Sequence, residues 1–185
     1  MIIIRQLEQF NVDNYYRLET GYITRSRYSV VKTESEETTE ILLQKRLLQQ
    51  PYRKVFGELD SESLIRYQSL PDLGFSYEAY NDDLLVGIAL AEPRLWNRSL
   101  WVWEFHVAKT HQGKGIGRRM MEVLEVKCKQ AGLRTMVCET QTTNVPAIGF
   151  YRKMGFSIEG IDLSYYTNQD YPDGEVALFM KKRIE

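Results

Sequence analysis

The residues best suited to chemistry lie in one mid-chain segment, which runs from Val107 to Arg119. Three glycines alternate there between the end of an expected strand and the start of an amphipathic helix; they are Gly113, Gly115 and Gly117. Glycine allows backbone N–H groups to turn toward an anion, and a helix N-terminus adds free donors and a favourable dipole. The segment therefore predicts a phosphate-binding loop, to which three cations add charge: Lys114, Arg118 and Arg119.

The spacing of this loop excludes two common phosphate-binding motifs. A P-loop requires Ser or Thr after Gly-Lys, but Gly115 follows Lys114. A dinucleotide-binding fingerprint requires a third glycine where Arg118 or Met120 stands. What remains is Gln-x-x-Gly-x-Gly from Gln112 to Gly117, and a glycine-rich turn without a ligand is the alternative.

A second segment, from Glu139 to Phe156, carries Asn144, Ala147 and Tyr151 before a Gly-Phe pair. Together with the Gln-x-x-Gly-x-Gly loop, it resembles the GNAT superfamily of N-acetyltransferases. The run Glu139-Thr-Gln-Thr-x-Asn-Val-Pro-Ala, followed by Gly160-Ile-Asp, is similar to the streptothricin acetyltransferase branch. The resemblance covers residues 100 to 170, whereas Gln112 replaces a more usual Arg and Trp103 stands where that branch carries an acidic residue.

The resemblance implies a site for acetyl-CoA. Two histidines and two cysteines without close pairing argue against a structural zinc site. The residues that the resemblance assigns to the cosubstrate are Phe105, His106, Val107, Gln112, Gly113, Lys114, Gly115, Ile116, Gly117, Arg118, Asn144 and Ala147. Asn144 would bond the pantetheine arm, and Tyr151 would act as the general acid that protonates the departing thiolate. A phenol can donate such a proton. The alternative for Tyr151 is an ordinary core aromatic residue on an amphipathic helix.

The expected strand Leu100–Val107 carries the candidate general base. Alternation predicts that Trp101, Trp103, Phe105 and Val107 share one face and that Val102, Glu104 and His106 share the other. The family resemblance adds a bulge that frees backbone groups near Phe105 to Val107, where one N–H would polarise the thioester carbonyl. Glu104 is the first candidate base; a structural partner for His106 or an arginine is its alternative role, and His106 as the base stays open.

The resemblance to the streptothricin branch implies a small polycationic acceptor that is acetylated on a primary amine. Carboxylates would hold it, with Glu139 and Asp162 beside Trp103 as substrate-binding residues and Tyr165 and Tyr166 as cation platforms. Asp162 could instead cap a turn. Direct attack is expected because Cys128 and Cys138 read as small apolar residues. Alternatives are a peptide-amine or polyamine acetyltransferase and a non-catalytic acyl-CoA-binding module.

The composition argues against several other classes of protein. The formal net charge is −1, which argues against a generally basic nucleic-acid binder, and no apolar run approaches the ~20 residues that span a bilayer. Two cysteines cannot form a disulfide framework, and Met-Ile-Ile-Ile-Arg is too short for a signal-peptide core. We expect a cytoplasmic enzyme with a small-molecule substrate and no nucleic-acid or membrane partner; a homodimer stays open.

The elements expected to position these residues form one α/β GNAT domain over residues 1–185, with a mixed, mostly antiparallel sheet of about seven strands covered by helices. The sheet would splay at the acetyl-CoA site. Expected strands are 2–7, 75–80, 84–91, 100–107, 135–140, 156–164 and 175–182. Expected helices are 11–19, 116–131, 145–154 and one that starts with a capping box at Thr33–Glu36 and ends at Pro51. Residues 20–32 are expected to form a loop.

Overall fold

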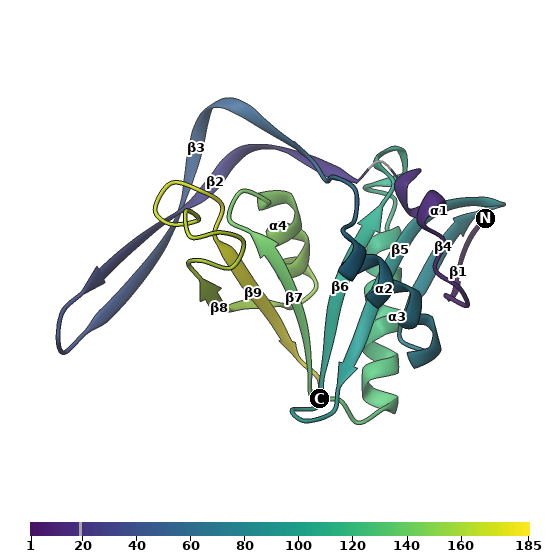
Figure 1. The fold of residues 1–185 in the computed structure, drawn as a ribbon. Helices are drawn as coiled ribbons and strands as arrows, with labels where there is room; N and C mark the ends of the chain where they lie inside the picture. Colours follow the sequence, from purple (N-terminus) through teal and green to yellow (C-terminus); the bar gives the residue numbers. More distant parts are fainter. Residues whose placement is uncertain (19) are drawn as a thin grey trace. The chain divides into compact units, whose positions relative to one another are not determined.

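The computed structural model describes residues 1–18 and 20–185 (Figure 1). Its strands are β1 (Ile2–Gln6), β2 (Gly21–Glu34), β3 (Thr39–Val55), β4 (Tyr77–Asn81), β5 (Leu84–Arg94), β6 (Ser99–Val107), β7 (Thr135–Gln141), β8 (Ser157–Asp162) and β9 (Ala177–Arg183). Its helices are α1 (Val12–Tyr16), α2 (Ser61–Ser69), α3 (Ile116–Gln130) and α4 (Val145–Lys153). Two 3₁₀ turns cover Pro71–Leu73 and Lys109–His111.

The chain divides into two compact units. The first comprises Met1–Gly21, Val55–Cys138 and Lys182–Glu185, and the second comprises Tyr22–Lys54 and Glu139–Lys181. Seven strands form a sheet in the order β1-β4-β5-β6-β7-β9-β8, and β2 and β3 form a separate two-stranded sheet. The α/β fold with a mixed seven-stranded sheet is therefore confirmed.

In the first unit, helices cover both faces of the sheet. Successive residues of β5 point to opposite faces: a Cβ on Gly87 would lie 2.8 Å from Sδ of Met120 in α3. The next residue, Ile88, belongs to a buried cluster on the other face that includes Tyr15 and Tyr67 of the α1–α2 region. The apolar face of α3 is buried as its period predicted, with Ile116, Met120, Leu124 and Cys128 almost fully enclosed. Within this unit, β6 lies between β5 and β7.

The turn and cap signals of the second half are confirmed. Asn144 caps α4, and Gly132 and Gly155 adopt left-handed φ angles of +66° and +88° just after α3 and α4. The hairpin between β4 and β5 turns at Asp82, which has a φ of +54°. Asn11 caps α1, which ends at Tyr16, and Glu19, the last residue of the predicted helix, lies outside the described residues.

The prediction for residues 20–51 is wrong. The expected loop is strand β2, and the expected capped helix is strand β3, which continues through Pro51 to Val55. The Ser35 amide donates to the Thr38 carbonyl at 2.8 Å, so the acidic segment forms a hairpin turn and not a first helical turn. The apolar spacing of residues 41–48 fits a helix locally, but pairing with β2 supplies the backbone partners that decide the outcome.

In the second unit, β2 is fixed along one side. Its even-numbered residues from Thr24 to Val30 are buried, the amide of Tyr28 donates to the carbonyl of Thr142 at 2.9 Å, and Arg152 of α4 donates to the Tyr28 hydroxyl at 2.8 Å. The strands β8 and β9 pair antiparallel, with a register shift between Ile158 and Gly160. These contacts hold α4 and its N-terminal residues in place within this unit.

Candidate active site

The glycine loop adopts the backbone conformation that its composition predicts. Gly113 and Gly115 have φ angles of +74° and +80°, and a Cβ on either would meet no atom within 4 Å. Gly115 is the N-cap of α3, so no side chain caps the helix. The first-turn amides of Ile116, Gly117 and Arg118 can therefore donate to an anion that approaches the open loop.

The cations of the loop differ in their partners. Arg118 donates from Nε to Glu122 at 2.8 Å, and Arg119 donates to the carbonyl of Ile2 at 3.2 Å. Lys114 has no oppositely charged partner within 4 Å among residues 1–18 and 20–185, which leaves its ammonium available for a phosphate. Gln112 donates from Nε2 to the carbonyl of Val107 at 3.0 Å, and this bond fixes the loop to the end of β6.

The backbone amides at the end of β6 alternate between the two edges of the strand. Its ladder with β7 ends at the pair Val102 and Cys138. The amide of Ala108 donates to Val86 of β5 at 2.8 Å, so even-numbered amides face β5 and those of Phe105 and Val107 face the opposite edge. This edge lies beyond the last β6–β7 pair, as the predicted splaying of the sheet requires.

A bulge interrupts β6 at Trp103 and corrects the predicted alternation. Leu90 pairs with Glu104 and Ala91 with Val102, so Trp103 has no opposite residue in the register of the β5–β6 ladder. Trp103 and Glu104 consequently both contact α2, where strict alternation would place them on opposite faces. The guanidinium of Arg66 lies 4.2 Å from the Trp103 ring centre, and the indole donates to Glu92 at 2.8 Å.

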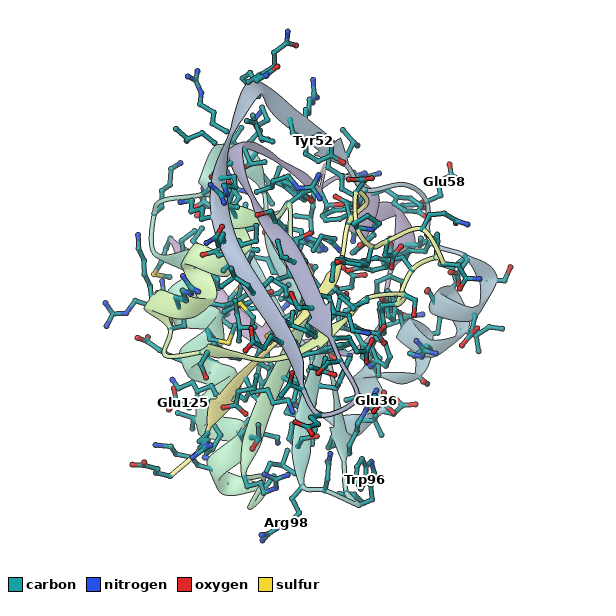
Figure 2. The ribbon with its side chains drawn as sticks, turned by 90° about the vertical axis from the view of Figure 1, so that its left-hand side faces the viewer. Glu36, Tyr52, Glu58, Trp96, Arg98 and Glu125 are labelled. Atoms are coloured by element: carbon teal, nitrogen blue, oxygen red, sulfur yellow. The ribbon has the colours of Figure 1, made fainter. Side chains whose placement is uncertain are left out.

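Trp101 lies beside Trp103, with ring centres 5.6 Å apart and Arg94 near both rings, whereas Trp96 does not share this environment. The guanidinium of Arg94 lies 3.9 Å from the ring centre of Trp101. Trp96 is 84% exposed in the turn between β5 and β6, where Figure 2 shows it close to Arg98. Trp103 is the tryptophan that packs against the buried cluster on the α1–α2 side.

Glu104 is the centre of a half-buried polar cluster on that side. It accepts from the Tyr67 hydroxyl at 2.7 Å, and its other oxygen lies 2.5 Å from Nε2 of His106. Burial alone would raise the pKa of Glu104, but the hydrogen bond and charge of His106, together with the Tyr67 hydroxyl, outweigh burial and lower that pKa. Burial and the charge of Glu104 raise the pKa of Tyr67 and of Tyr15, so both phenols stay protonated.

His106 is positioned by aromatic rings as well as by Glu104. Its Nε2 also lies 3.5 Å from the Tyr15 hydroxyl, and the rings of Tyr15 and Phe56 lie with their centres 5.8 and 5.7 Å from the imidazole centre. The sequence reading identified Glu104 and His106 but missed Tyr15 and Tyr67. Their positions depend on the packing of α1 and α2 against β6, and no local sequence motif encodes this packing.

In the second unit, α4 presents the downstream motif. Oδ1 of Asn144 accepts from the amide of Ala147 at 3.2 Å, so the cap uses the oxygen and leaves the Asn144 amide nitrogen as a donor. Tyr151 lies two turns further along α4, is 7% exposed, and contacts the rings of Phe150 and Phe156 at 5.5 and 5.6 Å. A hollow of 460 Å³ lies beside the helix, and its lining includes Ile23, Arg25, Pro146, Phe150 and Lys153.

The predicted acceptor carboxylates also lie in the second unit. The Tyr166 hydroxyl donates to Glu139, and burial and that charge raise the pKa of Tyr166. Asp162 accepts from the Ser164 amide at 3.0 Å, which is the turn-capping role that was its alternative. Tyr165 stacks edge-on against Tyr166 with ring centres 5.2 Å apart, and each is partly exposed.

Cys128 and Cys138 are buried and form no disulfide, and burial, with the charge of Glu125, raises the pKa of the Cys128 thiol to about 12. Within residues 1–18 and 20–185, no group of three or more His, Cys, Asp or Glu side chains could hold a metal ion. In the same described ranges, no helix is long and apolar enough to cross a bilayer.

The chain is similar in sequence to a known family and to characterised relatives. Residues 43–156 match the Acetyltransferase (GNAT) family. A streptothricin acetyltransferase from Streptomyces lavendulae is 36% identical over 99 residues, which are 54% of this chain and only 52% of the relative. The chain thus spans about half of that relative's length.

Two solved structures share the fold over the whole chain. A nourseothricin acetyltransferase superposes with a TM-score of 0.77 at 26% identity and covers 100% of this chain and 99% of its own. A structure described as a putative streptothricin acetyltransferase from Bacillus anthracis in complex with acetyl coenzyme A has a TM-score of 0.71 at 21% identity, with 99% of both chains covered.

Proposed function

The chain belongs to the GNAT acetyltransferase family, and we propose that it transfers an acetyl group from acetyl-CoA to a primary amine of a small polycationic acceptor, of the streptothricin type. The observation that carries the proposal is the uncapped first turn of α3 behind a loop whose two glycines have positive φ. In a member of this family, such a loop fits the pyrophosphate of coenzyme A. The relatives named above support the acceptor class.

Several groups of the chain fit the cosubstrate. Lys114 and the first-turn amides of α3 would bind the pyrophosphate, and the amide nitrogen of Asn144 would donate to the pantetheine arm. The N–H groups of Phe105 and Val107, which point to the edge of β6 away from β5, would donate to the thioester carbonyl and stabilise the negative charge that develops on its oxygen. The bound thioester supplies the acetyl group and the thiolate that leaves.

Glu104 is the proposed general base and Tyr151 the proposed general acid. Because the pKa of Glu104 is lowered, its carboxylate stays charged, attracts the acceptor ammonium and accepts its proton directly or through water. Tyr151 would return a proton to the thiolate. Transfer by direct attack agrees with two buried cysteines, of which Cys128 is held as a thiol by its raised pKa.

The acceptor's additional charges require further carboxylates. We assign them Glu139 and Asp162, with Trp103 as a wall of the acceptor site rather than a cation platform, because Arg66 already lies over its ring. Asp162 can serve both roles, since its turn uses one oxygen. Each contact of this partly exposed kind contributes about 1 kcal/mol.

Two other functions predict different results. A peptide-amine or polyamine acetyltransferase would acetylate those acceptors faster than a streptothricin. An acyl-CoA-binding module would bind CoA without turnover.

We also assign the chain to the cytoplasm, since neither cysteine forms a disulfide, and to one GNAT domain over residues 1–185.

The test measures thiol release from acetyl-CoA with streptothricin, aminoglycosides, polyamines and peptides. Tyr151→Phe removes only the hydroxyl of the proposed acid, so kcat should fall about 100-fold while acetyl-CoA affinity stays near the wild-type value. Phe150→Leu is the matched control on the next residue of α4. A preference for peptide amines, or turnover of Tyr151→Phe equal to that of the wild type, would overturn the assignment.

A further inference from the structure

A second cavity lies in the second unit, beside the start of α4. Its volume is 560 Å³, within the range of about 300–1,000 Å³ that is usual for ligand pockets. Residues 48–52 of β3, where Figure 2 labels Tyr52, form one wall, and residues 173–175 before β9 form another. Thr143 also lines the cavity and directly precedes Asn144, the N-cap of α4. The cavity therefore adjoins a residue that we assign to the pantetheine arm.

Hydrogen bonds within the chain hold the walls of this cavity together. Arg27 of β2 donates to the carbonyls of Asp173 and Gly174 at 3.3 and 2.6 Å. The carboxylate of Glu175 accepts hydrogen bonds from four side chains, which are Tyr22, Tyr52, Lys54 and Thr143. These bonds join β2, β3, the turn before α4 and the segment before β9, so the shape of the cavity is fixed by the chain itself.

The charge that stays unpaired among the lining residues is negative. Arg27 uses its donors on two carbonyls, and Lys54, next to the lining, is paired with Glu175. The Asp173 carboxylate, by contrast, has no oppositely charged side chain within 4 Å in the described part of the chain. Because an ammonium group carries three donors and a positive charge, it matches a carboxylate of this kind.

The other lining groups suit the chain that would carry such an ammonium. The carboxamide oxygens of Gln49 and Gln50 can accept further hydrogen bonds. Methylene groups can pack on the apolar surface of the wall, which consists of Leu48, Pro51 and the ring of Tyr52.

The cavity is also an electrostatic neighbour of the proposed acceptor carboxylates. Burial and Glu139 raise the pKa of Tyr166, and the charge of Glu175 adds to this effect. The Tyr166 hydroxyl donates to Glu139. Glu175, in the wall of the cavity, is thus close enough to act on the pair that Tyr166 forms with Glu139.

We propose that this cavity binds an aminoalkyl chain of the acceptor, whose ammonium pairs with Asp173 and donates to the carboxamide oxygens of Gln49 and Gln50. The inference rests on the function proposed above and adds Asp173 to it as a residue that determines acceptor specificity. An acceptor with a single amine cannot make this contact while that amine reacts, whereas an acceptor with two or more ammonium groups can.

The first experiment measures thiol release with streptothricin and saturating acetyl-CoA. Asp173→Asn keeps the size of the side chain and removes its charge, so the acceptor KM should rise about fivefold while kcat and the KM of acetyl-CoA stay within twofold. Added salt should reduce this difference from the wild type because it screens the removed charge. Asp83→Asn makes the same change at an exposed position of the first unit and should leave all three constants unchanged.

The second experiment fills the cavity. Gln50→Trp places a bulky ring in the lining and should raise the acceptor KM at least tenfold, whereas Gln130→Trp, at the exposed end of α3, should leave it unchanged. Calorimetry of streptothricin binding to the CoA-bound full chain tests the same variants without turnover. Circular dichroism confirms that each variant is folded.

The outcomes separate this inference from the proposed function. If the wild type acetylates streptothricin and both cavity variants have its acceptor KM, the cavity inference fails and the proposed function stands. If both variants weaken streptothricin binding but no variant shows turnover, the cavity is supported and the proposed function fails. A wild type that neither binds nor acetylates streptothricin would overturn both.

Discussion

Gly115 gives the sharpest test of the phosphate-binding loop. Its φ of +80° is a conformation that Asn and Asp adopt more readily than other residues with side chains, and a Cβ there meets no atom within 4 Å. Gly115→Asn and Gly115→Asp therefore share the same small backbone cost, about 1 kcal/mol, which corresponds to about 2–4 °C in Tm for a chain of this length. The two variants differ only in one negative charge.

The magnitude of that charge effect follows from Coulomb's law. A carboxylate about 6 Å from a phosphate oxygen opposes binding by about 0.7 kcal/mol at a dielectric constant of 80 and about 2.8 kcal/mol at 20. Gly115→Asp should accordingly bind CoA about 3- to 100-fold more weakly than Gly115→Asn. Isothermal titration calorimetry at low salt measures both affinities, and added salt should narrow the gap because it screens the repulsion.

Gly57 supplies the control for charge alone. It is exposed and its Cβ would also meet no atom within 4 Å, so Gly57→Asp adds the same charge outside the loop. CoA affinity should stay within twofold of the wild type. If Gly115→Asp and Gly115→Asn, both folded, bind CoA equally well, the loop does not hold the pyrophosphate and the reasoning from α3 fails.

Three further predictions concern packing, the Glu104 cluster and the acceptor. Gly87→Ala should lower the free energy of unfolding by about 1–3 kcal/mol in urea titrations, because its Cβ would approach Met120 Sδ to 2.8 Å and the His106 carbonyl to 3.2 Å; unchanged stability would contradict the tight packing of α3. Tyr67→Phe should lower the free energy of unfolding by about 1.5–3 kcal/mol at pH 7. The lowered pKa of Glu104 stabilises the fold above the normal carboxyl pKa, and this stabilisation is lost as pH falls through the lowered value, so the difference in stability between variant and wild type should shrink in acid. A difference in stability that does not depend on pH would refute this role of Glu104. Asp162→Asn keeps an acceptor for the Ser164 amide, so Tm should hold while acceptor KM rises several-fold, and an unchanged KM would leave Asp162 with the turn alone.

The sequence could predict the second half of the chain because its signals there are local. Glycines mark the start of α3 and the ends of two helices, Asn144 caps α4, and the β6 residues alternate up to the bulge. Each of these features depends on φ preferences and hydrogen bonds within a few residues. The same locality made the glycine loop and Asn144 recognisable as candidate cosubstrate-binding groups.

The hairpin of β2 and β3 could not be predicted in the same way. Leu42, Leu43 and Leu47 lie at spacings that suit one helical face, and Thr33 to Glu36 has the form of a capping box. Both signals are weak compared with a ladder of backbone hydrogen bonds to β2, which brings residues such as Ser29 and Gln44 together across the turn. Strand pairing of this range is decided by the partner and not by local propensity.

The basicity of Glu104 could not be predicted from the sequence either. Its type and strand position suggest a base, yet its basicity depends on His106, which the sequence places two residues away, and on Tyr67, which the fold brings from α2. Two donors lower the pKa of Glu104, so this carboxylate attracts an ammonium strongly and holds a proton weakly. The reactivity of the proposed base is thus set by residues from three elements, α1, α2 and β6, which no single motif contains.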